Sequence, residues 1–134
     1  MWALRVTGGL NDGDLVALLG DDDEHVRAWV IQFLAEDGAV SRSALERMAQ
    51  LAADDPSPLV RMYLASAMQR LPVEQRWETV AALASHGEDR EDHNLPLMVW
   101  YAAEPLAGAD MERALDLAAR AELPEILPFT IRRV

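Results

Sequence analysis

The feature that most constrains this chain is a set of apolar residues at helical spacing that recurs along the sequence. In each copy they follow the i, i+3, i+4, i+7 pattern of one face of an α-helix. The first three copies are Val26, Trp29, Val30, Phe33 and Leu34; Val60, Tyr63, Leu64, Ala67 and Met68; and Leu95, Met98, Val99, Ala102 and Ala103. A fourth, less regular copy consists of Leu127, Thr130, Ile131 and Val134. A helical stripe that repeats every roughly 30–50 residues is typical of a helical repeat protein.

A short polar turn introduces each copy. The first two turns lead into Val-Arg pairs that end at Arg27 and Arg61, 34 residues apart. The third and fourth copies carry Pro96 and Pro128 where the arginines stand. Proline is tolerated in the first turn of a helix, where its missing N–H would have no intrahelical partner. The turns therefore mark the starts of four equivalent helices.

The stripes and the breakers between them predict an all-α fold: a right-handed α-solenoid of about four and a half helix pairs. We expect one domain over residues 1–134, as part of a larger protein. Ser43 is expected to cap one helix, with Glu46 completing a capping box. The expected helices are Trp2 to Thr7 (partial), Asp14 to Leu19, Glu24 to Ala35, Ala44 to Ala53, Pro58 to near Leu71, Glu74 to Ser85, Leu95 to Leu106, Met111 to Ala121 and Pro124 to Val134.

Composition excludes several classes of function. The net charge of -11 repels phosphate backbones, so nucleic acid is not an expected partner. All 12 basic residues are arginine and cysteine is absent, which excludes amine and thiol nucleophiles, disulfides and thiolate zinc sites. The apolar runs are short and interrupted, so membrane insertion is not expected.

An acidic turn that leads into Val-Arg at the head of a second helix is characteristic of HEAT-like repeats, and residues 22–27 and 55–61 resemble it. Residues 2–10, 24–29, 64–72 and 92–101 further resemble the HEAT-repeat region of planctomycete-type proteins labelled membrane-bound dehydrogenases or haem-binding proteins. The resemblance implies a periplasmic location. It also implies a propeller and a Cys-x-x-Cys-His haem segment outside the repeats, and this chain contains neither. The label therefore describes neighbouring domains more than this one.

The densest polar cluster is the loop from His86 to Asn94, which holds two imidazoles and four carboxylates. Such groups could hold a divalent cation, and an accessory domain with a metal or cofactor site here is the alternative function. The simpler interpretation is structural. Asp92 or Asn94 would cap the helix that starts at Leu95, and the other acids would satisfy turn backbone groups or face water.

The aromatic and arginine positions also have two interpretations. Trp29 and Trp77 lie on apolar stripes, which favours core packing over a ligand-stacking role. Arg27 and Arg61 occupy matching positions. We expect each to bond an acidic turn residue of the neighbouring repeat and form an internal ladder, with ligand binding as the open alternative.

The function predicted from these features is a non-catalytic scaffold that binds another protein or another domain of its parent chain. No catalytic residue, cofactor or metal is expected. Four residues just off the buried stripe, Arg61, Trp100, Tyr101 and Glu104, are predicted to line the concave face and contact the partner. The acidic turns around Asp21 to Glu24, Asp54 and Asp55, and Glu88 to Asp92 are predicted to form a stripe along one edge, where a cationic partner would bind in a salt-dependent way.

Overall fold

The computed structural model describes residues 12–36, 40–92 and 94–122. All the regular secondary structure in these ranges is helical, with seven α-helices, two short 3₁₀ helices and no strand. The elements are α2 (Asp12–Leu18), α3 (Glu24–Ala35), α4 (Arg42–Asp54), α5 (Pro58–Met68), η1 (Val73–Gln75), α6 (Trp77–Ala84), η2 (Gly87–Glu91), α7 (Leu95–Ala109) and α8 (Met111–Arg120). The all-α prediction is confirmed for this part of the chain. The helices predicted over Trp2 to Thr7 and Pro124 to Val134 lie outside the described residues.

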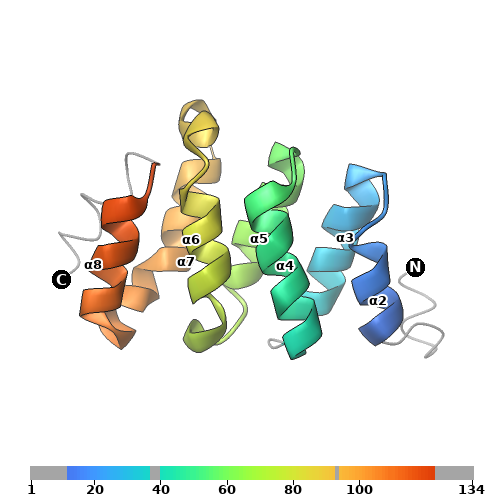
Figure 1. The fold of residues 1–134 in the computed structure, drawn as a ribbon, viewed down its shortest axis with the longest axis horizontal. Helices are drawn as coiled ribbons and strands as arrows, with labels where there is room; N and C mark the ends of the chain where they lie inside the picture. Colours follow the sequence, from blue (N-terminus) through green and yellow to red (C-terminus); the bar gives the residue numbers. More distant parts are fainter. Residues whose placement is uncertain (1–11, 37–39, 93, 123–134) are drawn as a thin grey trace.

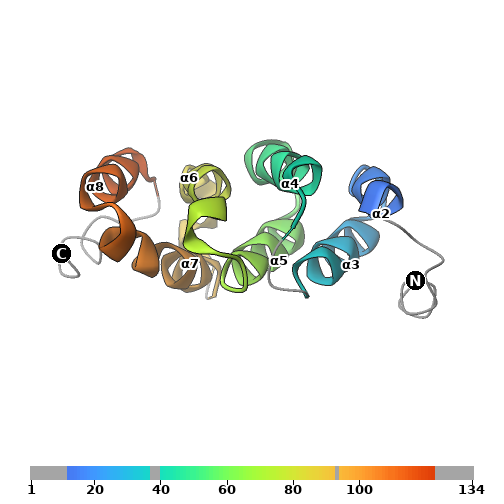
Figure 2. The same ribbon diagram turned by 90° about the horizontal axis from the view of Figure 1, so that it is seen from below.

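The helices lie in two layers (Figures 1 and 2). Figure 2 shows α2, α4, α6 and α8 in one row and α3, α5 and α7 in the other. Within the rows, α3 packs on α5, α5 on α7, and α4 on α6. Contacts across the layers join α2 to α3, α4 to α5, α5 to α6, α6 to α7 and α7 to α8, and α2 and α8 lie at opposite ends of the array (Figure 1). Helices that are alternate in sequence are therefore neighbours in space.

Side chains in the polar turns fix where the helices begin. The Asp23 carboxylate accepts the His25 backbone N–H at 2.8 Å at the start of α3. Ser57 caps α5, whose first residue is Pro58. Of the two caps predicted for α7, Asp92 is present, since its carboxylate accepts the Leu95 backbone N–H at 2.9 Å, whereas the Asn94 side chain makes no cap bond. Each cap satisfies an N–H that has no partner inside its helix.

The predicted cap of α4 is wrong by two residues. Ser41, with an extended backbone, accepts the Ala44 N–H at 3.2 Å, and the helix begins at Arg42. The earlier start also allows an i, i+4 ion pair between Arg42 and Glu46 at 3.2 Å in the first turn. Ser43, the predicted cap, is an exposed residue inside that turn.

Helix α7 continues through Pro105 to Ala109, three residues beyond its predicted end. Pro105 has no N–H to donate to the Tyr101 carbonyl, four residues earlier. Next to this gap, the buried Arg76 guanidinium donates to the Ala102 carbonyl at 3.1 Å and also to the Leu71 and Gln69 carbonyls. One arginine thus ties the end of α5 to the interrupted turn of α7.

The core is built from two series of equivalent positions on α3, α5 and α7. Val30, Leu64 and Val99 form one series, and all three are fully buried. The second series is Ile31, Ala65 and Trp100, with exposed fractions of 0%, 0% and 9%. Trp77, predicted to be in the core, is also buried.

The prediction that Trp29 packs in the core is wrong, because 53% of the residue is exposed. The buried face of α3 includes Ala28 and Ile31, which the predicted stripe omitted, so the true face is rotated away from Trp29. Trp29 contacts Phe33 edge to face, with ring centroids 6.0 Å apart, at the border of the core.

Candidate binding surface

The outward face of the α3, α5 and α7 layer carries a row of large apolar side chains at equivalent positions. Trp29 is 53% exposed, and Tyr63 and Met98, its counterparts on α5 and α7, are half-buried. The next outward row consists of Gln32, Ser66 and Tyr101, and Tyr101 is 51% exposed. We call this surface the inner-row face.

A groove of about 280 Å³ runs across the inner-row face. It is lined by Gln32 of α3, by Met98 of α7, by Met62, Tyr63 and Ser66 of α5, and by Arg70 in the turn after α5. Since Gln32, Ser66 and Arg70 are exposed, polar groups border an apolar interior. This mixture is typical of a surface that contacts a ligand or a partner.

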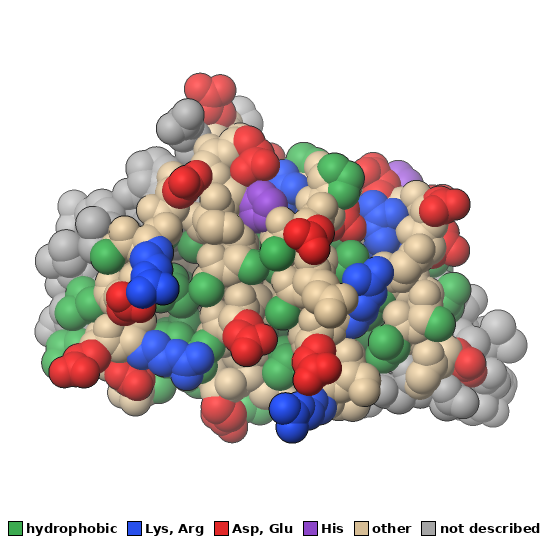
Figure 3. Space-filling view, in the orientation of Figure 1, with side chains coloured by type: hydrophobic (Ala, Val, Ile, Leu, Met, Phe, Trp, Pro, Cys, Tyr) green, Lys and Arg blue, Asp and Glu red, His purple; other side chains and the backbone are tan. Residues whose placement is uncertain are grey.

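The opposite layer has a different surface. On the side formed by α4, α6 and α8, acidic and basic side chains are interspersed, with small apolar areas between them (Figure 3). The Arg113 guanidinium covers the Trp77 ring at 4.4 Å from its centroid, which joins α8 to α6. Charges of both signs on this side offer no concentrated field for an anionic polymer.

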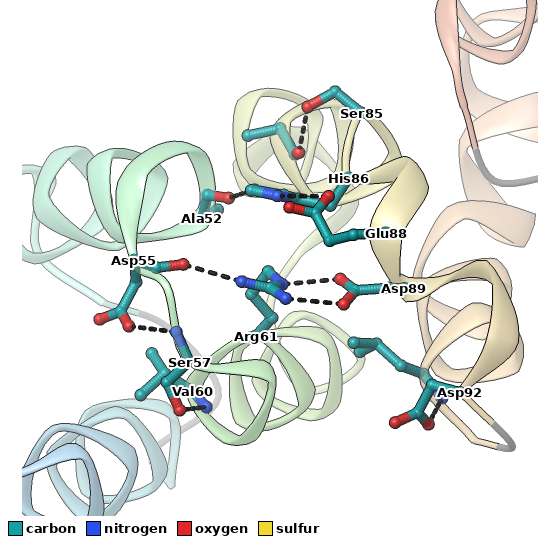
Figure 4. Close-up of polar contacts among 12 residues, drawn as sticks. Ala52, Asp55, Ser57, Val60, Arg61, Ser85, His86, Glu88, Asp89 and Asp92 are labelled. Atoms are coloured by element: carbon teal, nitrogen blue, oxygen red, sulfur yellow. Dashed lines mark hydrogen bonds and ion pairs between the residues drawn. The ribbon is translucent and has the colours of Figure 1, made fainter.

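The matching arginines form the predicted ladder between repeats. Arg27 Nε donates to Asp55 Oδ2 at 2.8 Å, and its Nη1 donates to the Asp21 carbonyl. The same arrangement recurs 34 residues later. There Arg61 bonds both carboxylate oxygens of Asp89 at 2.6 Å and donates to the Asp55 carbonyl (Figure 4). The structural interpretation of the two arginines is confirmed.

Two residues predicted to contact a partner are committed to this ladder instead. Arg61 is 3% exposed and Asp55 is 5% exposed, so neither presents a surface to another molecule. The prediction that Arg61 projects into the concave face is wrong. The Arg61 guanidinium instead turns toward the turns that precede α5 and α7. There the Asp89 carboxylate and the Asp55 carbonyl accept its hydrogen bonds.

The other predicted contact residues divide by exposure. Tyr101 and Asp54 are exposed, although they lie on different surfaces: the inner-row face and the turn between α4 and α5. Trp100 is buried in the core series. Glu104 is half-buried and makes an interaction within the chain. Of the four residues predicted to contact a partner from the concave face, Tyr101 is therefore the one whose large side chain is exposed on the inner-row face.

Side chains of the loop from His86 to Asn94 hold neighbouring helices together. His86 Nε2 contacts the Ala52 carbonyl at 2.5 Å, one of the last carbonyls of α4, and its Nδ1 lies 3.2 Å from Glu88 Oε1 (Figure 4). Asp89 pairs with Arg61, and Asp92 caps α7. Among the described residues no group of three or more His, Asp or Glu side chains is arranged to hold a metal ion. His93 lies outside the described residues.

The contact with His86 affects the titration of Glu88. Its own backbone N–H, and then the hydrogen bond with His86, lower the pKa of the Glu88 carboxyl below 4.5. Because the folded pKa lies below the unfolded one, the resulting stability is fully present above about pH 4.5 and is lost as the pH falls through the folded pKa. The carboxylate is 64% exposed, so solvent screening keeps the effect small.

We expect His86→Gln to raise the pKa of Glu88 while leaving it below the ordinary value of a glutamate, because the hydrogen bond from its own backbone N–H remains. The Glu88 carboxyl chemical shift, followed by NMR through an acid titration, would measure this pKa. If the substitution returned Glu88 to the ordinary value, the backbone N–H would not be the larger cause.

The acidic turns lie along one edge, because each joins a helix of one layer to a helix of the other. The two ladder pairs bridge successive turns and place them side by side. Several of the acids have internal roles: Asp21, Asp23 and Asp55 accept backbone N–H groups, and Glu24 accepts the Ser57 hydroxyl at 2.8 Å. Asp22, Asp54 and Glu91 are exposed on this edge.

Comparisons with protein-family models, with curated proteins and with solved structures each found no match. In the part of the chain that the structure describes, no helix combines the length and the apolar character needed to cross a bilayer.

Sequence reasoning did not find the groove. A signal was present, since Tyr63 and Met98, which line the groove, stand at the position of Trp29 in the repeats. The apolar stripe included them as core residues, and periodicity alone does not separate the border of a buried face from its centre.

Proposed function

We propose that this chain is a non-catalytic protein-binding module, a short right-handed α-solenoid of HEAT-like helix pairs. Its inner-row face would bind another protein or another domain of the same parent chain. The two-layer arrangement and the 34-residue recurrence of the arginine ladder support the repeat architecture. In such arrays each repeat contacts only its neighbours, and one layer offers a continuous surface.

The observation that carries the proposal is the outward row of Trp29, Tyr63 and Met98. Trp29 is 53% exposed, and Tyr63 and Met98, at the equivalent positions of α5 and α7, pack against the core but stay partly accessible. Apolar surface that is continuous over several elements marks sites of interaction. Trp and Tyr are also enriched among the residues that dominate binding energy.

Site-specific photo-crosslinking in cells that express the protein naturally would test the proposal. A photoreactive amino acid would replace Trp29, Tyr101 or, as the matched control, Met111. Met111 is as exposed as Trp29, at 53%, but belongs to α8 in the other layer. We expect the same crosslinked protein from Trp29 and Tyr101 and none from Met111. Equal crosslinking from all three positions would contradict a dedicated inner-row face.

A second measurement separates binding from folding. We expect Tyr101→Ala to change the free energy of unfolding by no more than about 0.5 kcal/mol, because the side chain is half exposed. Trp29→Ala should cost about 1 kcal/mol through loss of the Phe33 contact. Urea unfolding would measure both. The partner found by crosslinking should bind each variant more weakly than the wild type.

A further inference from the structure

The dimensions of the groove restrict what it can hold. Its α5 side runs from Met62 to Ala67, a rise of about 7.5 Å along the helix, and continues to Arg70 in the turn after α5. Its volume of about 280 Å³ lies just below the range of roughly 300–1,000 Å³ typical of sites for drug-sized molecules and cofactors. The space suits one or two large side chains of a protein segment better than a whole cofactor.

The groove lining is adapted to apolar side chains. Ala35 and Ala67 are buried and supply small groups beneath the opening, while Met62, Tyr63 and Met98 form its walls. Methionine is unbranched and polarisable, so it adjusts to side chains of different shape. The Gln69 amide contacts the Met98 sulfur at 3.9 Å.

A cation stands at the end of this apolar channel. Arg70 is exposed at the C-terminal end of α5, and no ion pair, hydrogen bond or ring contact of its side chain is found in the described part of the chain. Every other arginine whose side chain is described is engaged: Arg27, Arg42, Arg47, Arg61, Arg76, Arg113 and Arg120. An exposed guanidinium beside an apolar groove is suited to pair with a carboxylate of a bound partner.

We propose that the groove binds a protein segment that inserts one or two apolar side chains along α5 and places one Asp or Glu carboxylate against Arg70. The rest of the segment is neutral or basic, because the net charge of -11 repels an acidic chain as a whole. This inference rests on the proposed function and adds the chemistry of the partner.

The test selects peptides from a displayed random-sequence library on the immobilised full chain and measures their binding by fluorescence polarisation. Each selected peptide is compared with versions in which its acidic residue is Gln or Lys. The protein variants are Arg70→Gln, Arg70→Glu, Ser66→Arg and the control Arg47→Glu, which changes the net charge equally on α4 in the other layer. Circular dichroism and thermal melts confirm that each variant is folded.

We expect the selected sequences to share apolar anchors and one acidic residue. Arg70→Gln should weaken their binding about two- to fivefold, as expected for an exposed ion pair. Arg70→Glu should reverse the preference, so that the Lys peptide binds better than its acidic parent. Ser66→Arg should abolish binding by filling the groove, and Arg47→Glu should leave the preference unchanged.

Other results would overturn the inference. One such result is that Arg70→Glu still prefers the acidic peptide over its Lys version. Another is that the wild type binds the acidic and Gln peptides equally, and a third is that the selection enriches no peptide. A dimer of the wild type that Ser66→Arg dissociates would assign the groove to a second copy of the chain. If the peptides depend on Trp29 and Tyr101 but not on Ser66 or Arg70, this inference fails and the proposed function stands. If crosslinking also shows no preference for the inner-row face, both fail.

Discussion

Replacing Asp89 by alanine will lower the free energy of unfolding by about 3–5 kcal/mol, because it leaves the buried Arg61 guanidinium without its counter-charge. The side chains of Arg61 and Asp89 are 3% and 5% exposed, and two hydrogen bonds of 2.6 Å join them. Urea unfolding of the full chain at neutral pH would measure the loss.

The electrostatics of the pair predict how this stability responds to pH. The hydrogen bonds from Arg61 to Asp89 raise the pKa of the guanidinium above its ordinary value, against the opposing effect of burial. A group whose pKa rises on folding contributes stability below its unfolded pKa and loses it only as the pH passes the folded value. For arginine this window lies at strongly alkaline pH, so the cost of Asp89→Ala should be constant across neutral pH.

Two controls separate the cost of an unpaired charge from the value of the pair. Arg61→Met combined with Asp89→Leu should recover much of the loss, because an apolar pair leaves no buried charge. Arg27→Ala should cost less than Asp89→Ala, since the Arg27 side chain is 13% exposed and the remaining Asp55 still accepts the Ser57 N–H. If Asp89→Ala lowered the free energy of unfolding by less than about 1 kcal/mol, the Arg61–Asp89 pair would contribute no more than an exposed ion pair, which would contradict the prediction.

The ladder shows what the sequence could predict. Two arginines at matching positions of a repeat, each within reach of the next acidic turn, were enough to predict internal pairing, and both pairs are present. Which acid each arginine chooses was not predictable. The partners Asp55 and Asp89 are themselves 34 residues apart, but each stands in a turn that contains other carboxylates.

The positions of the aromatic residues show where sequence reasoning stops. Trp100 was placed off the stripe, yet it is the third member of the buried series that begins with Ile31 and Ala65. Trp29 was placed on the stripe and is half exposed. The Trp29 error comes from the rotation of the buried face away from that side chain, and the Trp100 error comes from the breadth of the buried face. A helix covered by a second layer and by a neighbour in its own row buries more than one stripe of an isolated amphipathic helix.

The groove likewise depends on how neighbouring helices pack. Its walls come from three helices whose outward positions are 34 or 35 residues apart, and only their side-by-side packing turns three separate side chains into one surface. The sequence contains the residues in register. Whether these residues are covered depends on the curvature and spacing of the layer. Both come from packing between helices, which no single segment specifies.

Leu64→Ala will destabilise the chain by roughly 2–5 kcal/mol, the range for removing a fully buried leucine. Leu64 is 0% exposed on α5, the middle helix of its row, which packs on both α3 and α7. The cavity would therefore weaken the packing of α5 on both of its neighbours, α3 and α7, at once.

The matched control is Leu97→Ala on α7, which removes the same atoms from a residue that is 40% exposed. It should cost less than about 1 kcal/mol. Ala-for-Leu exchange slightly favours the helix at both sites, so the difference between the two variants reports burial rather than helix propensity. Urea unfolding monitored by far-UV circular dichroism would give both values and show whether the transition remains single. A Leu64→Ala loss no larger than that of Leu97→Ala would mean that α3, α5 and α7 do not share one continuous core.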